Sequence, residues 1–153
     1  MLTDHHQRLV EAAIQGCIAK EYAYAPYSKF RVGAAFLCAD DTIVKGANVE
    51  NASWGGTICA ERTAVVKAVS EGQKDFTALA VTSDVATPIS PCGICRQVLR
   101  EFCTSDMPIF LVPADYPKKD AEDGGILEVT AGSLLPHSFG PEDLELPRKT
   151  TGP

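Results

Sequence analysis

Hydrophobic positions at helical spacing open the chain and give way to strand-like segments. Between residues 4 and 24 the apolar side chains recur every three or four positions, which predicts one amphipathic helix. Pro26 disfavours a helical backbone in the residue before it, so we expect the helix to end there. Two segments of strand character, 30–37 and 42–49, flank the turn-forming residues 39–41 and predict a β-hairpin.

The rest of the pattern alternates helices with short apolar strands. Helical spacing from residue 59 to 71 stops at Gly72, and glycine commonly terminates helices. Ser90 and Pro91 predict the N-cap and the first turn of another helix, which continues to Phe102. The other expected elements are strands at 79–82, 109–112 and 126–130, a surface loop at 118–125 and a short helical turn at 133–135.

Strands that alternate with helices predict an α/β fold in which helices cover the sheet, and the early hairpin makes that sheet mixed. A chain of 153 residues suits a single domain, and no internal repeat divides it. We expect the domain to occupy residues 1–145 and the polar residues 146–153 to form a disordered tail.

Charge and hydropathy narrow the choice of partners. The formal net charge is −6 and the basic residues are scattered, whereas nucleic-acid affinity depends on clustered Lys and Arg. No run approaches the roughly 20 apolar residues of a membrane span, and the first ten residues lack a signal-peptide hydrophobic region. We therefore expect a cytoplasmic protein with a small, weakly charged ligand, and neither nucleic acid nor membrane as a partner.

Six cysteines in a chain of this length are better explained by metal binding or packing than by disulfides. Disulfide frameworks are typical of small secreted domains, but this chain has 45% hydrophobic residues and no apparent secretion signal. In a reducing compartment, thiols serve as metal ligands or as small buried hydrophobic residues. The cysteines on apolar faces of predicted elements, which we expect to be packing residues, are Cys17, Cys38 and Cys103.

Cys92 and Cys95 form a CxxC pair at the start of a predicted helix. Residues three apart share a helix face, and a helix N-terminus favours the thiolate that binds zinc. The pair is compatible with a thioredoxin-like redox pair, a structural zinc half-site or a catalytic zinc half-site. A structural zinc finger needs a second ligand pair at short spacing, and the sequence has none.

Cys59 is the third candidate ligand. Successive parallel strands present the N-termini of their helices along one sheet edge, so Cys59 can converge with the CxxC pair. Three ligands leave a fourth tetrahedral position open, which is typical of catalytic zinc. Glu61 would then carry protons without binding the metal, and Arg62 would offset the negative charge of three thiolates. Without this context, Glu61 and Arg62 would be interpreted as a solvated helix face.

These motifs resemble those of the cytidine deaminase family, the small zinc-dependent nucleoside type. Zinc deaminases combine cysteine ligands on a P-C-x-x-C helix with a nearby glutamate that is not a ligand. The resemblance spans most of the chain and rests on segments 25–35, 46–52, 59–62, 91–97 and 134–144. It implies a three-layer α/β/α fold with a mixed sheet of about five strands.

The resemblance also implies roles for single residues. Asn48 and Glu50 would hold the ribose, chiefly its 3′-hydroxyl. Phe30 would pack against the pyrimidine, and the backbone around Ala60 would fix the base. Phe139 would enter the pocket of a neighbouring subunit, because the family is typically a homotetramer with shared active sites.

The expected reaction is zinc-dependent hydrolytic deamination of cytidine and 2′-deoxycytidine to uridine and 2′-deoxyuridine, with release of ammonia, as in pyrimidine salvage. One Zn²⁺ per chain is implied. Trp54 departs from the pattern, because a tyrosine or phenylalanine is expected there. One alternative is a deaminase of another cytosine compound, such as blasticidin S or a polynucleotide cytosine. Another is a non-catalytic zinc-stabilised binding protein, although Glu61 would be useless for merely holding zinc.

Overall fold

The computed structural model describes residues 4–15 and 17–149. A five-stranded sheet lies at its centre, in the order β2-β1-β3-β4-β5. The strands are β1 (Val32–Cys38), β2 (Ile43–Ala47), β3 (Phe76–Ser83), β4 (Pro108–Val112) and β5 (Leu127–Thr130). The β3–β4 pair is parallel, whereas β1–β2, β1–β3 and β4–β5 are antiparallel, so the sheet is mixed as predicted.

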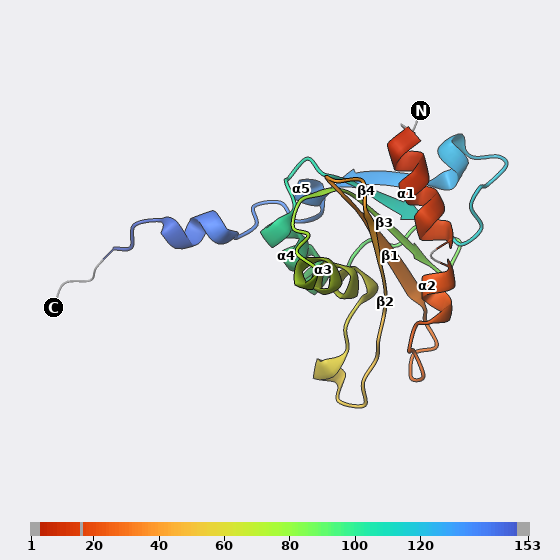
Figure 1. Ribbon diagram of the computed structural model, residues 1–153, viewed down its shortest axis with the longest axis horizontal. Coiled ribbons are helices and arrows are strands. Elements are labelled where there is room, and N and C mark those ends of the chain that lie inside the picture. Colours follow the sequence, from red (N-terminus) through yellow and green to blue (C-terminus); the bar gives the residue numbers. More distant parts are fainter. Residues whose placement is uncertain (1–3, 16, 150–153) are drawn as a thin grey trace.

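Helices cover both faces of this sheet (Figure 1). The helices are α1 (Asp4–Gln15), α2 (Cys17–Glu21), α3 (Ala60–Ser70), α4 (Gly93–Phe102) and α5 (Ala131–Leu134). Alternate residues of a strand point to opposite faces. In β1, Ala34, Phe36 and Cys38 join the core under α3 and α4, whereas Ala35 and Leu37 join the core under α1. The three-layer α/β/α prediction is confirmed.

Strand β2 and helix α3 approach each other closely at Gly46. A Cβ atom built on Gly46 would lie 2.5 Å from the Ala64 backbone nitrogen and 2.6 Å from the Ala60 carbonyl oxygen. Only glycine permits that approach without displacing one of the two elements. The first turn of α3, which follows Cys59, is therefore fixed against the sheet.

The first predicted helix differs from the structure at its C-terminal end. Helix α2 ends at Glu21, and no helix includes Tyr24. The Tyr24 N–H donates to the Asn48 carbonyl at 3.0 Å, and the Glu50 N–H donates to the Tyr24 carbonyl at 2.7 Å. These bonds to a distant segment outweigh the local helical pattern. The side chain of Cys17, predicted to be a packing residue, lies outside the described part of the chain.

The second predicted helix boundary is also wrong, by two residues. Helix α4 begins at Gly93 with Cys92 as its N-cap, not Ser90. The Ser90 hydroxyl instead accepts a hydrogen bond from Arg96 at 2.7 Å. The Ser90 hydroxyl oxygen therefore takes part in a tertiary hydrogen bond and does not cap the helix.

Other predictions agree with the structure or stay predictions. Cys38 and Cys103 are buried, as expected of packing residues. Strand β3 extends beyond the predicted 79–82 at both ends. The segment 118–125 contains a short 3₁₀ turn at Glu122–Gly125. Among the described helices, none is both long and apolar enough to cross a bilayer.

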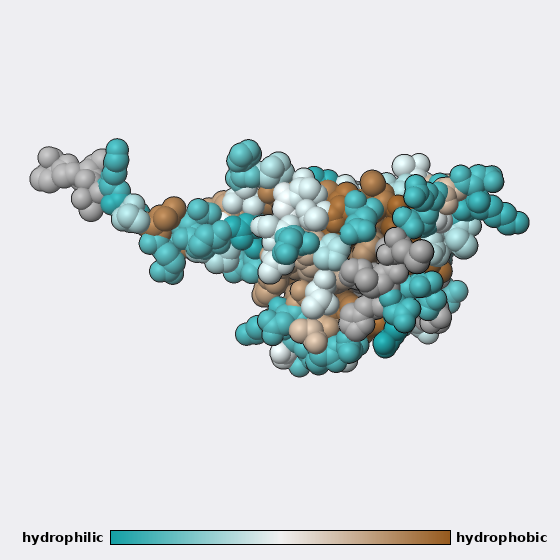
Figure 2. Space-filling model, turned by 90° about the horizontal axis from the view of Figure 1, so that it is seen from above, coloured by the Kyte–Doolittle hydropathy of each residue, from teal (hydrophilic) through white to brown (hydrophobic). Residues whose placement is uncertain are grey.

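The C-terminal segment projects away from the three layers (Figure 1). It carries a 3₁₀ turn at Pro141–Glu145, and residues 146–149 belong to no helix or strand. Figure 2 shows hydrophobic surface on this projecting arm, where Leu144 and Leu146 are exposed. Residues 150–153, part of the predicted tail, lie outside the described residues, and the domain boundary at 145 stays a prediction.

Candidate active site

Three cysteine sulfurs meet where two helices begin. Cys59 is the N-cap of α3, Cys92 is the N-cap of α4, and Cys95 lies in the first turn of α4. Strands β2 and β3 are each antiparallel to β1 and so run in the same direction, which brings the starts of α3 and α4 to one sheet edge. All three Sγ atoms lie within 4.8 Å of one another.

The sulfur cluster fits a tetrahedral zinc ion. Zinc binds thiolate at about 2.3 Å, so two ligands of a tetrahedron lie about 3.8 Å apart. The Sγ atoms of Cys59 and Cys92 are separated by 3.8 Å. Three thiolates at this spacing match a zinc ion that keeps its fourth position for another group, and no other group of three such ligands occurs among the described residues.

Hydrogen bonds and a nearby cation favour the thiolate form of Cys59. A hydrogen bond from the Cys95 thiol, assisted by Arg62, holds the pKa of Cys59 at about 5 against the opposing effect of burial. The hydrogen bond that the Cys95 thiol donates to Cys59 also raises the pKa of Cys95. The Arg62 Nη2 lies 3.7 Å from the Cys59 sulfur and 3.3 Å from the Thr57 carbonyl. Its guanidinium therefore lies where it can offset part of the charge of a Cys59 thiolate, and its role toward bound zinc stays a prediction.

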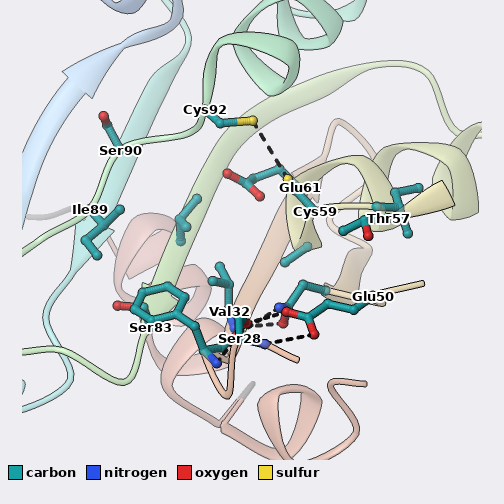
Figure 3. A pocket seen from close by; sticks show the side chains of 15 residues that line it. Ser28, Val32, Glu50, Thr57, Cys59, Glu61, Ser83, Ile89, Ser90 and Cys92 are labelled. Atoms are coloured by element: carbon teal, nitrogen blue, oxygen red, sulfur yellow. Dashed lines mark hydrogen bonds between the residues drawn. The ribbon is translucent and has the colours of Figure 1, made fainter. Parts of the chain in front are cut away.

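Glu61 is a buried carboxyl group beside the sulfurs. It lies in the first turn of α3 and is only 5% exposed. Burial raises its pKa, because the charged form loses water. In Figure 3 its carboxylate points toward the cavity at the end where Cys59 and Cys92 lie. A carboxyl group with a raised pKa in this position is suited to accept and return a proton.

A cavity of about 420 Å³ connects this end to a second polar group. Figure 3 shows Cys59, Cys92 and Glu61 together at one end, and Ser28 and Glu50 together at the other. Four of the predicted substrate residues line it, namely Phe30, Asn48, Glu50 and Ala60. The cavity therefore brings together a reactive end and a hydrogen-bonding end.

Phe139 is the predicted substrate residue that does not line this cavity. Its side chain is 57% exposed, and its backbone carbonyl accepts a hydrogen bond from Gln97 Nε2 at 3.0 Å. Helix α4 therefore anchors the backbone of this segment and leaves the ring facing outward.

Asn48 is anchored by the backbone of the segment opposite. Its Oδ1 accepts from the Val32 N–H at 2.9 Å, and its Nδ2 donates to the Phe30 carbonyl at 2.8 Å. One N–H and one lone pair of the amide remain for a ligand. The same two bonds fix the backbone beside Phe30, so Asn48 shapes the cavity wall as well as lining it.

Glu50 is held by a turn that the sequence analysis did not single out. Its Oε2 accepts from the N–H groups of Tyr27 at 2.9 Å and Ser28 at 3.2 Å. The Ser28 hydroxyl donates to Oε1 and is the main reason that the pKa of Glu50 is lowered. Ser28 lies in segment 25–35, which carries part of the family resemblance, but a serine in a loop has no hydrophobic periodicity, so its contact with Glu50 could not be predicted from the pattern.

Trp54 lies beside the same end of the cavity. Its ring centroid is 6.3 Å from that of Tyr27, whose N–H binds Glu50. The indole is 80% exposed, and it belongs to a 3₁₀ turn at Trp54–Gly56. The departure from the family pattern therefore leaves the sulfur cluster untouched.

The fold and the site together define a zinc-dependent deaminase: an α/β/α layer structure with three cysteines at two helix starts and a buried glutamate beside them. Residues 3–111 match the family described as "Cytidine and deoxycytidylate deaminase zinc-binding region". The chain belongs to the cytidine deaminase family, whose members are hydrolases, and its cofactor is zinc.

Relatives and solved structures extend this match to most of the chain. It is 48% identical to cytidine deaminase of Halalkalibacterium halodurans over 138 residues, which cover 90% of this chain and 96% of the relative. It is 52% identical to that of Sporosarcina psychrophila, covering 82% and 87%. The crystal structure of cytidine deaminase from Burkholderia pseudomallei superposes with a TM-score of 0.74 at 41% identity, covering 90% of this chain and 100% of that one. The Mycobacterium tuberculosis structure gives 0.70 at 39%, with 91% and 99% covered.

Proposed function

We propose that this chain hydrolyses cytidine and 2′-deoxycytidine to uridine and 2′-deoxyuridine and releases ammonia. The observation that carries the proposal is one cavity that Cys59, Cys92 and Glu61 line at one end and Asn48 and Glu50 line at the other, with Cys95 buried behind the first end. One end is suited to attack on a ring carbon, and the other to a sugar. The cytidine deaminases that this chain resembles support the choice of base.

The reactive end provides proton transfer. Cys59, Cys92 and Cys95 would hold the zinc ion, which when bound would act as a Lewis acid and lower the pKa of a neighbouring water. Glu61 takes a proton from the attacking water and delivers it to ring N3. It then takes the second proton of the former water from the hydroxyl on C4 and transfers it to the departing amine, so that water and cytidine become uridine and ammonia. Because burial raises the pKa of Glu61, its carboxyl group is suited both to accept a proton and to return it.

The other end orients the substrate. Asn48 keeps one free N–H and one lone pair, and Glu50 presents a carboxylate fixed by three hydrogen bonds. An amide and a carboxylate together can bind a sugar hydroxyl. Phe30 and the backbone at Ala60 form part of the cavity wall and contact the base. Binding energy from the ribose then holds ring C4 at the reactive end.

The charges of the lining favour a nucleoside over a nucleotide. The residues that line the cavity include two carboxylates, Glu50 and Glu61, and no Lys, Arg or His. A 5′-phosphate or a polynucleotide backbone would be repelled there and would find no cation to bind. We therefore assign free cytidine and 2′-deoxycytidine as substrates, in preference to deoxycytidylate or a cytosine within RNA or DNA.

The assembly belongs to the same proposal. We assign a homotetramer in which Phe139 reaches the cavity of a neighbouring subunit. The 57% exposure of Phe139, its absence from the cavity of its own chain and the exposed Tyr22 and Trp54 support an interface. We also assign the enzyme to pyrimidine salvage in the cytoplasm, without nucleic acid or membrane partners, on the basis of substrate and net charge.

A substrate panel tests this function. The purified protein, with its zinc content measured, is incubated with cytidine, 2′-deoxycytidine and cytidine 5′-monophosphate while ammonia release is followed. We expect rapid turnover of both nucleosides and at least about 100-fold lower kcat/KM for the monophosphate, since two carboxylates face the ligand. A zinc-loaded protein that leaves both nucleosides intact, or that prefers the monophosphate, would contradict the proposal.

A further inference from the structure

Arg96 follows the CxxC pair directly, and its guanidinium points back toward the segment that precedes it. Its Nε donates to the Pro91 carbonyl at 2.7 Å, and its Nη2 donates to the Ser90 hydroxyl at 2.7 Å. Its Nη1 donates to the Leu134 carbonyl at 2.9 Å. Three donors of one side chain therefore connect α4, the segment before it and helix α5.

The three sulfurs are supported unequally by the rest of the fold. Cys95 is buried inside α4. Cys59 follows Ile58, whose backbone pairs with that of Val49 through two hydrogen bonds of 2.9 Å. Cys92 is exposed, lies outside the helix as its N-cap and follows residues 84–91, which form no helix or strand. The position of its sulfur depends on how that segment is held.

We propose that Arg96 is a positioning residue that fixes the Ser90–Pro91 segment and thereby places the Cys92 sulfur for zinc. This inference deepens the proposed function and rests on zinc binding at the three cysteines. A planar guanidinium suits the task, because it donates two bonds in a fixed geometry to neighbouring oxygens. A positioning role also explains why the Ser90 hydroxyl does not cap the helix.

The same contacts tie the metal site to a part of the chain beyond the family match, which ends at residue 111. Leu134 is the last residue of α5, and its carbonyl accepts one of the three bonds from Arg96. Ser90 is itself part of the cavity wall. Loss of Arg96 therefore loosens a ligand segment and a wall of the cavity together.

Arg100 provides a matched control one helical turn further along. It lies on the same helix and is also bound to the C-terminal segment, through the Ser138 hydroxyl at 2.9 Å and through Glu142. The hydrogen bonds described for it do not include the segment before Cys92. A general loss of stability would affect variants of both Arg96 and Arg100, whereas a loss of Cys92 positioning would affect only the Arg96 variants.

Zinc release measures positioning without requiring any substrate. The wild-type protein, Arg96→Gln, Arg96→Lys and Arg100→Gln are loaded with zinc and mixed with excess chelator, and metal transfer to a colorimetric indicator is followed. We expect Arg96→Gln to release zinc about 10- to 100-fold faster than wild type, as for other residues that orient metal ligands. Arg96→Lys, with one flexible donor group, should be intermediate, and Arg100→Gln should match wild type within about twofold.

Each result supports or overturns the assignment. Equal zinc release from Arg96→Gln and Arg100→Gln would overturn it, whatever their melting temperatures. If Arg96→Gln does not fold, Ser90→Ala removes a single contact, and we expect about two- to fivefold faster release; an unchanged rate would overturn the proposal. A wild-type protein that binds no zinc would instead overturn the proposed function, so the two failures are distinguishable.

Discussion

The two ends of the cavity are built from different kinds of structure. At the metal end, the cysteines begin helices α3 and α4, whose inner faces are buried against the sheet. At the hydrogen-bonding end, where we propose that the sugar binds (the sugar end), Asn48 and Glu50 follow strand β2. They are held by N–H groups of residues 27, 28 and 32. The cysteines and Glu61 therefore depend on the packed core, whereas Asn48 and Glu50, the proposed substrate contacts, depend on a few polar bonds near the surface.

This difference has a consequence for mutation. Removal of a zinc ligand or of the group that transfers protons eliminates a group that acts directly in the reaction. A loop contact contributes a modest free energy that a single substitution removes. Substitution of a zinc ligand or of Glu61 should therefore have a larger effect on turnover than substitution of a residue at the sugar end.

The largest effect is expected for Cys59→Ala. Two remaining thiolates do not hold zinc as three do, so the zinc content should fall from one per chain to near zero and turnover should become undetectable. Bound zinc at 100 times its Kd stabilises a protein by about 2.7 kcal/mol, so the melting temperature should fall as well. Elemental analysis, an ammonia-release assay with cytidine and calorimetry check the three results.

Cys103→Ala is the control for that experiment, because Cys103 is a buried thiol at the C-cap of α4, at the opposite end of the helix from the cluster. It should keep one zinc per chain and full turnover. Retention of zinc and activity by Cys59→Ala would contradict the assignment of the metal end.

The next largest effect is expected for Glu61→Gln, which keeps the shape of the side chain but cannot transfer protons. The kcat for cytidine should fall by about 10²- to 10⁴-fold, the usual contribution of a positioned acid–base group. Zinc content should remain at one per chain, because Glu61 is not a ligand. Steady-state kinetics on zinc-quantified protein provide the measurement, and undiminished turnover would rule out the proton-transfer role.

Glu50→Ala tests the sugar end. A hydrogen bond to a charged group contributes about 1.5–3 kcal/mol, so kcat/KM for cytidine should fall about 10- to 150-fold while zinc content is unchanged. The substrate offers its own control: with 3′-deoxycytidine, wild type and variant should differ by only a few-fold. An equal loss with both nucleosides would mean that Glu50 does not bind the 3′-hydroxyl.

The smallest effect is expected for Ser28→Ala, which removes the hydroxyl that donates to Glu50 and lowers the pKa of that carboxyl group. The two backbone bonds to Glu50 remain, so the loss should be about 0.5–1.5 kcal/mol, or about two- to twelvefold in kcat/KM. In a Glu50→Ala background the same substitution should have no further effect. Equal losses in both backgrounds would assign Ser28 a role independent of Glu50.

The metal end could be predicted from the sequence because its parts obey local rules. A CxxC pair at a helix start, and a Cys-x-Glu-Arg run at another, carry their spacing in the chain itself, and strand order brings the two starts together. The α/β class followed from the alternation of strand-like and helical patterns, and the three-layer arrangement followed from the family resemblance. The residue-level resemblance then pointed to the zinc-dependent family.

The errors and omissions share one physical cause, which is competition between local preference and distant contacts. Tyr24 leaves the predicted helix because its backbone pairs with that of Asn48 and Glu50. Ser90 does not cap helix α4, because its hydroxyl oxygen accepts a hydrogen bond from Arg96. Ser28 has no pattern around it, so its contact with Glu50 is visible only in three dimensions.

A zinc titration of the stripped enzyme tests the central claim most directly. Metal is removed with chelator, zinc is returned in steps, and the rate of ammonia release from cytidine is measured at each step. Activity should rise linearly from zero and stop rising at one zinc per chain. Full cytidine turnover by the zinc-free protein, or a rate that does not respond to one equivalent of zinc, would contradict the account.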